Sequence, residues 1–102
     1  MEVLQDRVVL VTGGATKVGV GIVQCLARSG AHVIVVDIDA EGGAQLTEQI
    51  PQVEFHTLDI TDDSAIGSLM DSISQRFGKL DGLVNLACSY LDEGANSPRA
   101  DW

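Results

Sequence analysis

The sequence predicts an α/β fold in which a parallel sheet is doubly wound, with helices on both faces. Short apolar runs, typical of strands covered on both sides, alternate along the chain with stretches whose apolar residues recur at helical spacing. The resulting order is β-α-β-α-β-α-β, and such alternation implies parallel strands joined by right-handed crossovers. The length of 102 residues, 45% of them hydrophobic, suits one small domain with its own core.

A strand and a helix begin this pattern. Residues 8–11 (VVLV) are a continuous apolar run and predict the first strand. Residues 18–28 carry an apolar stripe at helical spacing, and Gly30 follows at the place where a helix usually ends. Residues 33–36 predict a second buried strand, which ends at Asp37.

The next helix and strand have weaker patterns. A helical pattern begins at Asp39 or Ala40 and continues to residue 50, where Pro51 closes it. Residues 53–58 alternate between apolar and polar side chains, which suits a strand near the edge of a sheet.

Thr61 is the expected N-cap of the third helix. Its hydroxyl can accept a hydrogen bond from the first N–H groups of a helix, and the acids at positions 62 and 63 favour a helix N-terminus. The apolar face of this helix extends from Ile66 to Phe77 and includes Met70, and Gly78 is expected to end it. Residues 83–86 predict the fourth strand.

With the strand order 3-2-1-4, the fourth strand forms one edge of the sheet. Its residues are apolar on both faces. Natural edge strands usually carry a charged residue or a proline that prevents further pairing, and this strand has neither. We therefore expect a sheet that is truncated after strand 4. Residues 1–102 are interpreted as the N-terminal half of a larger domain.

The charge of the chain excludes several classes of partner. Its net charge of −9, from 15 acids against six Lys and Arg, argues against nucleic acids and anionic membranes, because both select a basic surface. No apolar run is long enough to cross a bilayer, and no signal-like segment begins the chain, so we expect a soluble, cytoplasmic protein. Cys25 and Cys88 lie far apart, and His32 and His56 lack partners at ligand spacing, so no metal site is predicted.

A glycine-rich segment follows the first strand, in the stretch VVLVTGGATKVGVG at residues 8–21. A loop from a parallel strand into a helix directs N–H groups and the positive end of the helix dipole at a phosphate above the sheet. Gly13 permits a tight turn, and Gly19, which has no Cβ, lets the backbone approach a diphosphate. The alternative is a plain turn between strand and helix, in which glycine serves packing only. A P-loop is excluded because Lys17 is followed by Val18 rather than Ser or Thr, and the strict G-x-G-x-x-G fingerprint is also absent.

Asp37 ends the second strand, 24 residues after Gly13. An acid near this distance can accept hydrogen bonds from ribose hydroxyls, and it would repel a 2′-phosphate. Asp39 and Glu41 follow closely and no arginine is near, so the pattern favours NAD over NADP as the cofactor. The alternative interpretation of Asp37 is a helix N-cap in the following loop.

Four markers stand in the order found in the N-terminal half of the short-chain dehydrogenase/reductase family, and the chain resembles that family over almost its entire length. They are TGGATKVG at residues 12–19, VVDID at 35–39, LDIT at 58–61 and DGLVNLAC at 81–88. The resemblance implies a Rossmann-like fold and an oxidoreductase that moves a hydride between a nicotinamide cofactor and an alcohol or carbonyl carbon. The cofactor-binding residues that it implies are Gly13, Thr16, Lys17, Val18, Gly19, Asp37, Ile38, Asp59, Ile60, Asn85 and Ala87.

Lys17 departs from the family's pattern T-G-x-x-x-G-x-G, because it replaces the middle glycine. A lysine there could crowd the diphosphate, offer it a cation or point into solvent. It could also reach a 2′-phosphate, and this possibility keeps NADP open as the less favoured cofactor.

The two later markers imply contacts to adenine and ribose. By the resemblance, Asp59 accepts from the adenine amino group and Ile60 donates its backbone N–H; the alternative for Asp59 is a turn acid before the cap of the third helix. Asn85 and Ala87 match the family's N-N-A-G segment, which lies along the ribose, although its second and fourth residues differ here.

No residue of this chain is predicted to be catalytic. The family's catalytic tyrosine, lysine, serine and asparagine come from its later half, and Tyr90 is followed four residues on by Gly94 instead of a lysine. We expect this chain to be the cofactor-binding half, inactive alone, of a protein that acts on a small-molecule substrate and forms a homo-oligomer. The alternatives are a non-catalytic module that senses a dinucleotide, a pseudoenzyme fragment, and a flavodoxin-like domain that would not bind NADH.

Overall fold

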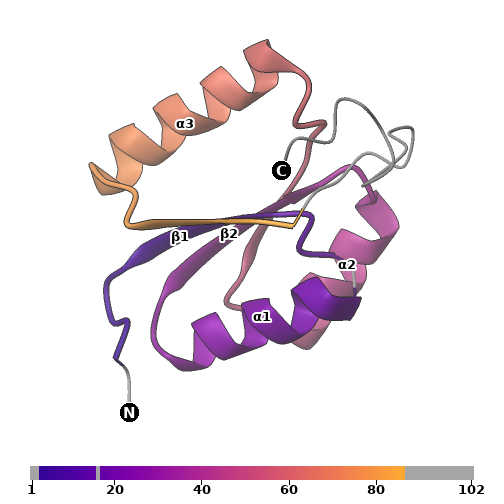
Figure 1. Cartoon of the computed structure of the whole chain (residues 1–102), viewed down its shortest axis with the longest axis vertical. Coiled ribbons are helices and arrows are strands. Elements are labelled where there is room, and N and C mark those ends of the chain that lie inside the picture. Colours follow the sequence, from indigo (N-terminus) through magenta and orange to yellow (C-terminus); the bar gives the residue numbers. More distant parts are fainter. Residues whose placement is uncertain (1–2, 16, 87–102) are drawn as a thin grey trace, which may run out of the picture.

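The chain forms one parallel sheet with helices on both faces, as a computed structural model shows for residues 3–15 and 17–86 (Figure 1). All three strand pairs are parallel, and the strand order is β3-β2-β1-β4, which confirms the predicted 3-2-1-4 arrangement. In chain order the elements are β1 (Val8–Thr12), α1 (Lys17–Arg28), β2 (His32–Asp37), α2 (Ala40–Gln49), β3 (Glu54–Thr57), α3 (Asp63–Phe77) and β4 (Gly82–Asn85).

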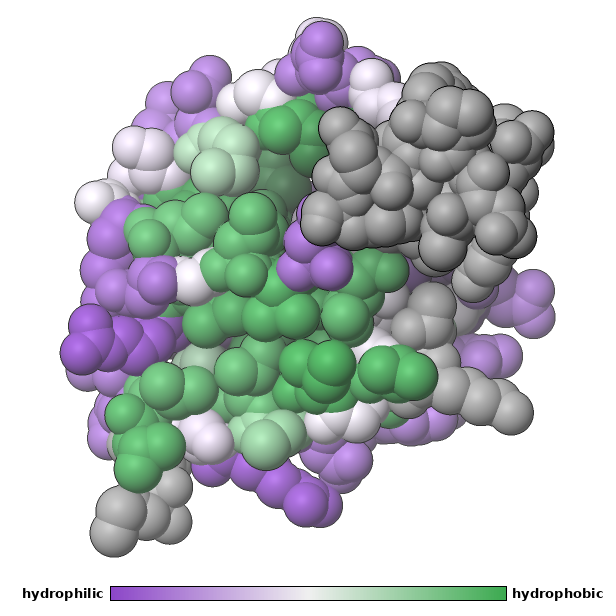
Figure 2. All heavy atoms as spheres, in the orientation of Figure 1, coloured by the Kyte–Doolittle hydropathy of each residue, from purple (hydrophilic) through white to green (hydrophobic). Residues whose placement is uncertain are grey.

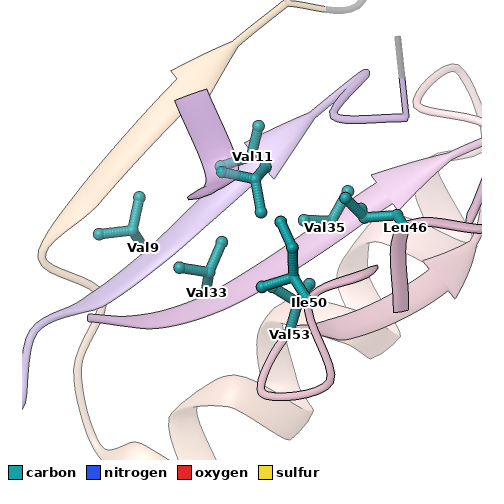
Figure 3. Packing of buried hydrophobic residues seen from close by; sticks show 8 residues of the cluster. Val9, Val11, Val33, Val35, Leu46, Ile50 and Val53 are labelled. Atoms are coloured by element: carbon teal, nitrogen blue, oxygen red, sulfur yellow. The ribbon is translucent and has the colours of Figure 1, made fainter. Parts of the chain in front are cut away.

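The two central strands send alternate side chains to opposite faces, so the sheet has a core on each side. Helices α1 and α2 cover one face, where Val9, Val11, Val33 and Val35 form a buried cluster with Leu46 of α2 (Figure 3). Helix α3 covers the other face (Figure 1), where the intervening residues of both strands pack against Leu69 and Ile73. This arrangement explains why both strands read as unbroken apolar runs.

The N-cap of α3 differs from the sequence prediction, whereas the start of α2 agrees with it. Asp62 caps α3 by accepting from the N–H of Ala65 (3.1 Å), so the prediction of Thr61 as the cap is wrong. The N–H and hydroxyl of Thr61 instead donate to Asp59, which leaves the next residue to cap the helix. Asp39 caps α2, and this excludes the alternative in which Asp37 is that cap.

The end of α3 and its apolar face follow the sequence more closely. Gly78 ends the helix in a left-handed conformation (φ 70°), as predicted, because glycine adopts a positive φ without a Cβ penalty. Within the predicted apolar face, Leu69 and Ile73 are buried, whereas Met70 is 37% exposed. No helix in the described part of the chain is long and apolar enough to span a membrane.

Strand β4 forms an edge of the described sheet. It pairs with β1 only, and its Leu83 side chain is 60% exposed. Figure 2 shows apolar residues gathered over the middle of the face on which β4 runs in Figure 1. The edge is therefore apolar, as the sequence predicts.

Candidate nucleotide-binding site

The carboxyl ends of the strands bring the predicted site residues to one edge of the sheet. Thr12, the last residue of β1, pairs with Val36 of β2 on one side and with Asn85 of β4 on the other. From β1 the sheet continues to β2 and β3 in one direction and to β4 in the other. This change of direction is the point at which open parallel sheets form a ligand-binding crevice, and the turn after β1 lies at it.

The turn after β1 is held in a tight conformation. Gly13 has a positive φ (76°), and its N–H donates to the carbonyl of Val36 (2.8 Å). Gly19, in the first turn of α1, lies so close to this turn that a Cβ would be 2.7 Å from three backbone atoms of Gly14. Glycine at position 19 is therefore required by the contact between the helix and the turn, whether or not a diphosphate approaches it.

Asp37 faces this turn from the end of β2. Its Oδ2 accepts from the backbone N–H of Ala15 (3.2 Å), and its Oδ1 accepts from the backbone N–H of Asp39 (3.0 Å). The carboxylate is partly buried and fixed at both oxygens. Since a carboxylate has about four lone-pair sites, each oxygen can still accept a further hydrogen bond from a ligand.

The edge that contains Asp37 is acidic. Asp39 follows on the same loop, and Glu41 lies in the first turn of α2. The three arginines within the described ranges lie toward the opposite edge, directly before β1 (Arg7), at the end of α1 (Arg28) and in the last turn of α3 (Arg76). A ligand group with negative charge at Asp37 would meet acids there and no guanidinium from these residues.

The ends of β1 and β4 are joined by a side-chain hydrogen bond. The Thr12 hydroxyl donates to Oδ1 of Asn85 (2.7 Å), and the Thr12 carbonyl accepts from the N–H of Leu86 (2.8 Å). Asn85 thus braces the two strands at the floor of the candidate site. The bracing role of Thr12, which is 7% exposed, was not predicted, because its partner lies 73 residues away and only the strand register brings them together.

Asp59 is a turn acid before the cap of α3, which is the alternative interpretation of this residue from the sequence. Its Oδ1 accepts from the backbone N–H of Thr61 (2.9 Å) and from the Thr61 hydroxyl (2.7 Å), and these bonds lower the pKa of the exposed Asp59 carboxyl. Oδ2 has no hydrogen bond within the described ranges, so it can accept from a ligand. The turn role and a ligand contact are compatible.

Three apolar side chains are exposed at this edge. Val18 is in the first turn of α1 and is 69% exposed, Ile38 follows β2 and is 71% exposed, and Ile60 follows β3 and is 39% exposed. Exposed apolar side chains from three segments at one edge of the sheet offer a surface for a flat apolar ring.

Two predicted cofactor residues, Thr16 and Ala87, lie outside the described residues, as does Tyr90. Lys17 is the first residue of α1. Within the described ranges, no group of three His, Cys, Asp or Glu side chains could hold a metal ion.

Comparisons with known proteins show the family to which the chain belongs. The family described as "short chain dehydrogenase" matches residues 7–100. The chain is 37% identical over 81 residues to L-fucose dehydrogenase of Bos taurus, covering 79% of this chain and 30% of that protein. It is 38% identical over 96 residues to sorbitol-6-phosphate 2-dehydrogenase of Klebsiella pneumoniae, covering 94% of this chain and 33% of that protein. The chain thus spans about a third of the length of these relatives.

Solved structures show the same likeness. A short chain dehydrogenase from Bacillus anthracis superposes with a TM-score of 0.78 at 26% identity, over 84% of this chain and 36% of that one. A 3-ketoacyl-(acyl-carrier-protein) reductase from Brucella melitensis, in complex with NADH, superposes with a TM-score of 0.70 at 28% identity, over 78% and 33% of the two chains.

Proposed function

Because the chain belongs to the short chain dehydrogenase family, we propose that it binds NAD at the carboxyl edge of its sheet. In the full-length protein this half would hold the cofactor for hydride transfer between the nicotinamide and an alcohol or carbonyl carbon of a small-molecule substrate. We further propose that the full-length protein is a cytoplasmic homo-oligomer that requires neither nucleic acid nor membrane.

The position of Asp37 carries the proposal. Its carboxylate lies beside the turn that would hold the diphosphate, where it can accept from the hydroxyls of the adenosine ribose. Hydrogen bonds to a charged group contribute about 1.5–3 kcal/mol each. A 2′-phosphate at the same place would repel the carboxylate by roughly 1–4 kcal/mol per unit charge, depending on the local dielectric. Together, the hydrogen bonds to the ribose and the repulsion of a 2′-phosphate favour NADH over NADPH by about tenfold or more in affinity.

The other residues would complete the proposed binding site. N–H groups in the first turn of α1 and the positive end of its dipole would hold the diphosphate, with Gly13 and Gly19 setting the shape of the turn. Ile38 and Ile60 would cover the faces of the adenine, while Asp59 would accept from its amino group. Asn85 would position the end of β4 beside the ribose.

A titration with both cofactors tests the proposal. The chain is titrated with NADH and, separately, with NADPH, and binding is followed by the fluorescence of the reduced nicotinamide. We expect NADH to bind at least tenfold more tightly, and Asp37→Asn to reduce this preference because it removes the charge. Asp71→Asn, an exposed acid on α3, is the matched control and should leave both affinities unchanged. Tighter binding of NADPH would refute the assignment of Asp37 and favour a contact from Lys17.

The absence of turnover in the isolated chain is a separate proposal. We expect no oxidation of common alcohols with NAD by the 102-residue polypeptide, because the catalytic residues of the family would lie in the rest of the protein. A rate above background in a turnover assay would contradict this expectation.

A further inference from the structure

Four residues form a ring between the turn after β1 and the start of α2, in which three hydrogen bonds join them and the fourth side is a close approach. Oδ2 of Asp37 accepts from the N–H of Ala15, and Oδ1 of Asp37 accepts from the N–H of Asp39. Oδ1 of Asp39 in turn accepts from the N–H of Gly42 (2.9 Å). A Cβ placed on Gly42 would lie 3.3 Å from the Cβ of Ala15, so the first turn of α2 packs against the residue at which the ring began.

The start of α2 depends strongly on the Asp39 cap. The helix has the sequence AEGGAQLTEQ, with glycines at its third and fourth positions. Glycine is roughly 1 kcal/mol less favourable than alanine in a helix, so two adjacent glycines make this turn prone to fray. The Asp39 side chain bonds to the N–H of Gly42, and its carbonyl accepts from the N–H of Gly43 (2.9 Å). These bonds fix the backbone of Asp39, whose own N–H holds Asp37.

We propose that Asp39 is a positioning residue for cofactor selection, which acts through the ring on the carboxylate of Asp37. The inference rests on the proposed binding of NAD and adds a residue that determines its specificity. Asp39 holds its own N–H in place by capping α2, and this N–H keeps one oxygen of Asp37 fixed while the other bonds to Ala15. The negative charge of Asp39 is not required for this role, because asparagine caps a helix about as well as aspartate does.

Three variants separate position from charge and from helix stability. Asp39→Ala removes the cap, and we expect NADH affinity to fall roughly fivefold, the factor that corresponds to the loss of one N-cap. Asp39→Asn removes the charge but keeps the acceptor. It should restore NADH affinity, and it should restore the preference over NADPH apart from the repulsion that the exposed Asp39 charge itself contributes. Gly42→Ala raises helix propensity. Its Cβ would nevertheless lie 2.5 Å from Oδ2 of Asp39 and displace the capping carboxylate, so we expect the preference for NADH to fall.

Glu48→Gln, an exposed acid near the other end of α2, is the matched control and should change neither affinity. The inference is overturned if Asp39→Ala binds NADH and NADPH as the unmodified chain does. It is also overturned if Asp39→Asn loses as much as Asp39→Ala, since charge rather than position would then be responsible. Increased preference for NADH in Gly42→Ala would indicate helix stability alone and would equally refute it.

Hydrogen exchange measures the ring without any cofactor. In Asp39→Ala the amide of Ala15 should exchange faster than in the unmodified chain, while the amide of Gly78, at the opposite edge, should not change. An unchanged rate at Ala15 would refute the coupling through Asp37. If the unmodified chain binds neither NADH nor NADPH, the proposed function fails, and the exchange at Ala15 still decides whether Asp39 holds Asp37.

Discussion

Replacing Gly19 with alanine tests whether the turn after β1 and the start of α1 are packed as tightly as the structure shows. A Cβ at this position would be 2.7 Å from the Cα, the carbonyl carbon and the carbonyl oxygen of Gly14. All three are backbone atoms, so no side-chain rotation can relieve the overlap. Either the turn or the helix must move.

Gly21 provides a matched comparison in the same helix. It is exposed, and a Cβ there would meet nothing within 4 Å. Gly21→Ala should therefore stabilise the chain by roughly 0.5–1 kcal/mol, through better helix propensity and a less flexible unfolded state. Gly19→Ala should destabilise it by roughly 1–3 kcal/mol, the usual cost of overpacking. The two alanine variants are thus expected to differ by about 1.5–4 kcal/mol in the free energy of unfolding.

Urea unfolding measures this difference. The only tryptophan, Trp102, lies outside the described residues, so far-UV circular dichroism is the appropriate signal. With a denaturant dependence of about 1–3 kcal/mol per molar, the midpoints of the two variants should be separated by about 0.5 M or more. Equal midpoints, or a more stable Gly19→Ala, would show that the contact between Gly19 and Gly14 is not present in solution.

Two further predictions concern charge. Arg76 donates two hydrogen bonds to Glu54 (2.7 Å each), and these bonds, with a smaller contribution from His56, lower the pKa of Glu54 from 4.5 to about 2. Because the folded-state pKa of Glu54 is lowered, the stabilisation of the fold by the ionised Glu54 is complete above pH 4.5 and is lost as the pH falls toward 2. In acid unfolding experiments, Arg76→Ala should therefore flatten this part of the curve of stability against pH. Both side chains are partly exposed, so a double-mutant cycle at pH 7 should give only about 0.5–1 kcal/mol, and a coupling near zero would contradict the paired geometry. At a net charge of −9, NADH binding should strengthen as salt rises from about 0.01 to 0.1 M, because the Debye length falls from about 30 to 10 Å; weaker binding would instead indicate a direct cationic contact to the cofactor.

The sheet could be predicted from the sequence because its two central strands, β1 and β2, are buried on both faces. The apolar runs that contain Val9 and Val33 are typical of strands covered on both faces, and the end of α3 at Gly78 follows from a residue that tolerates a positive φ. Caps were harder to predict because several competent residues stand together. Thr61, Asp62 and Asp63 can each accept from a helix N–H, and the hydrogen bonds of Thr61 to the preceding turn decide among them.

The candidate site could be predicted where it depends on the spacing of residues along the chain. It could not be predicted where it depends on how two strands align in the sheet. The position of Asp37 at the carboxyl end of its strand, facing the glycine turn, follows from the length of one crossover. The bond between Thr12 and Asn85 depends on how β1 and β4 align across 73 residues, and no local pattern indicates it. The sequence left two explanations for Gly19, the approach of a diphosphate and packing within the turn, and the structure shows a backbone contact that requires glycine in the absence of any ligand.

The overall charge of the chain and the fixed carboxylate contribute differently to cofactor choice. The net charge of −9 repels every dinucleotide and repels NADPH more, but this long-range part is screened by salt. The Asp37 carboxylate is partly buried and bonded at both oxygens, so its short-range effect on a ribose hydroxyl or a 2′-phosphate is screened much less. A preference for NADH that persisted at high salt would therefore be the part attributable to Asp37 and to the ring that holds it. A preference that disappeared at high salt would belong to the net charge of the chain, and would leave the geometry at the carboxyl edge without a role in selection.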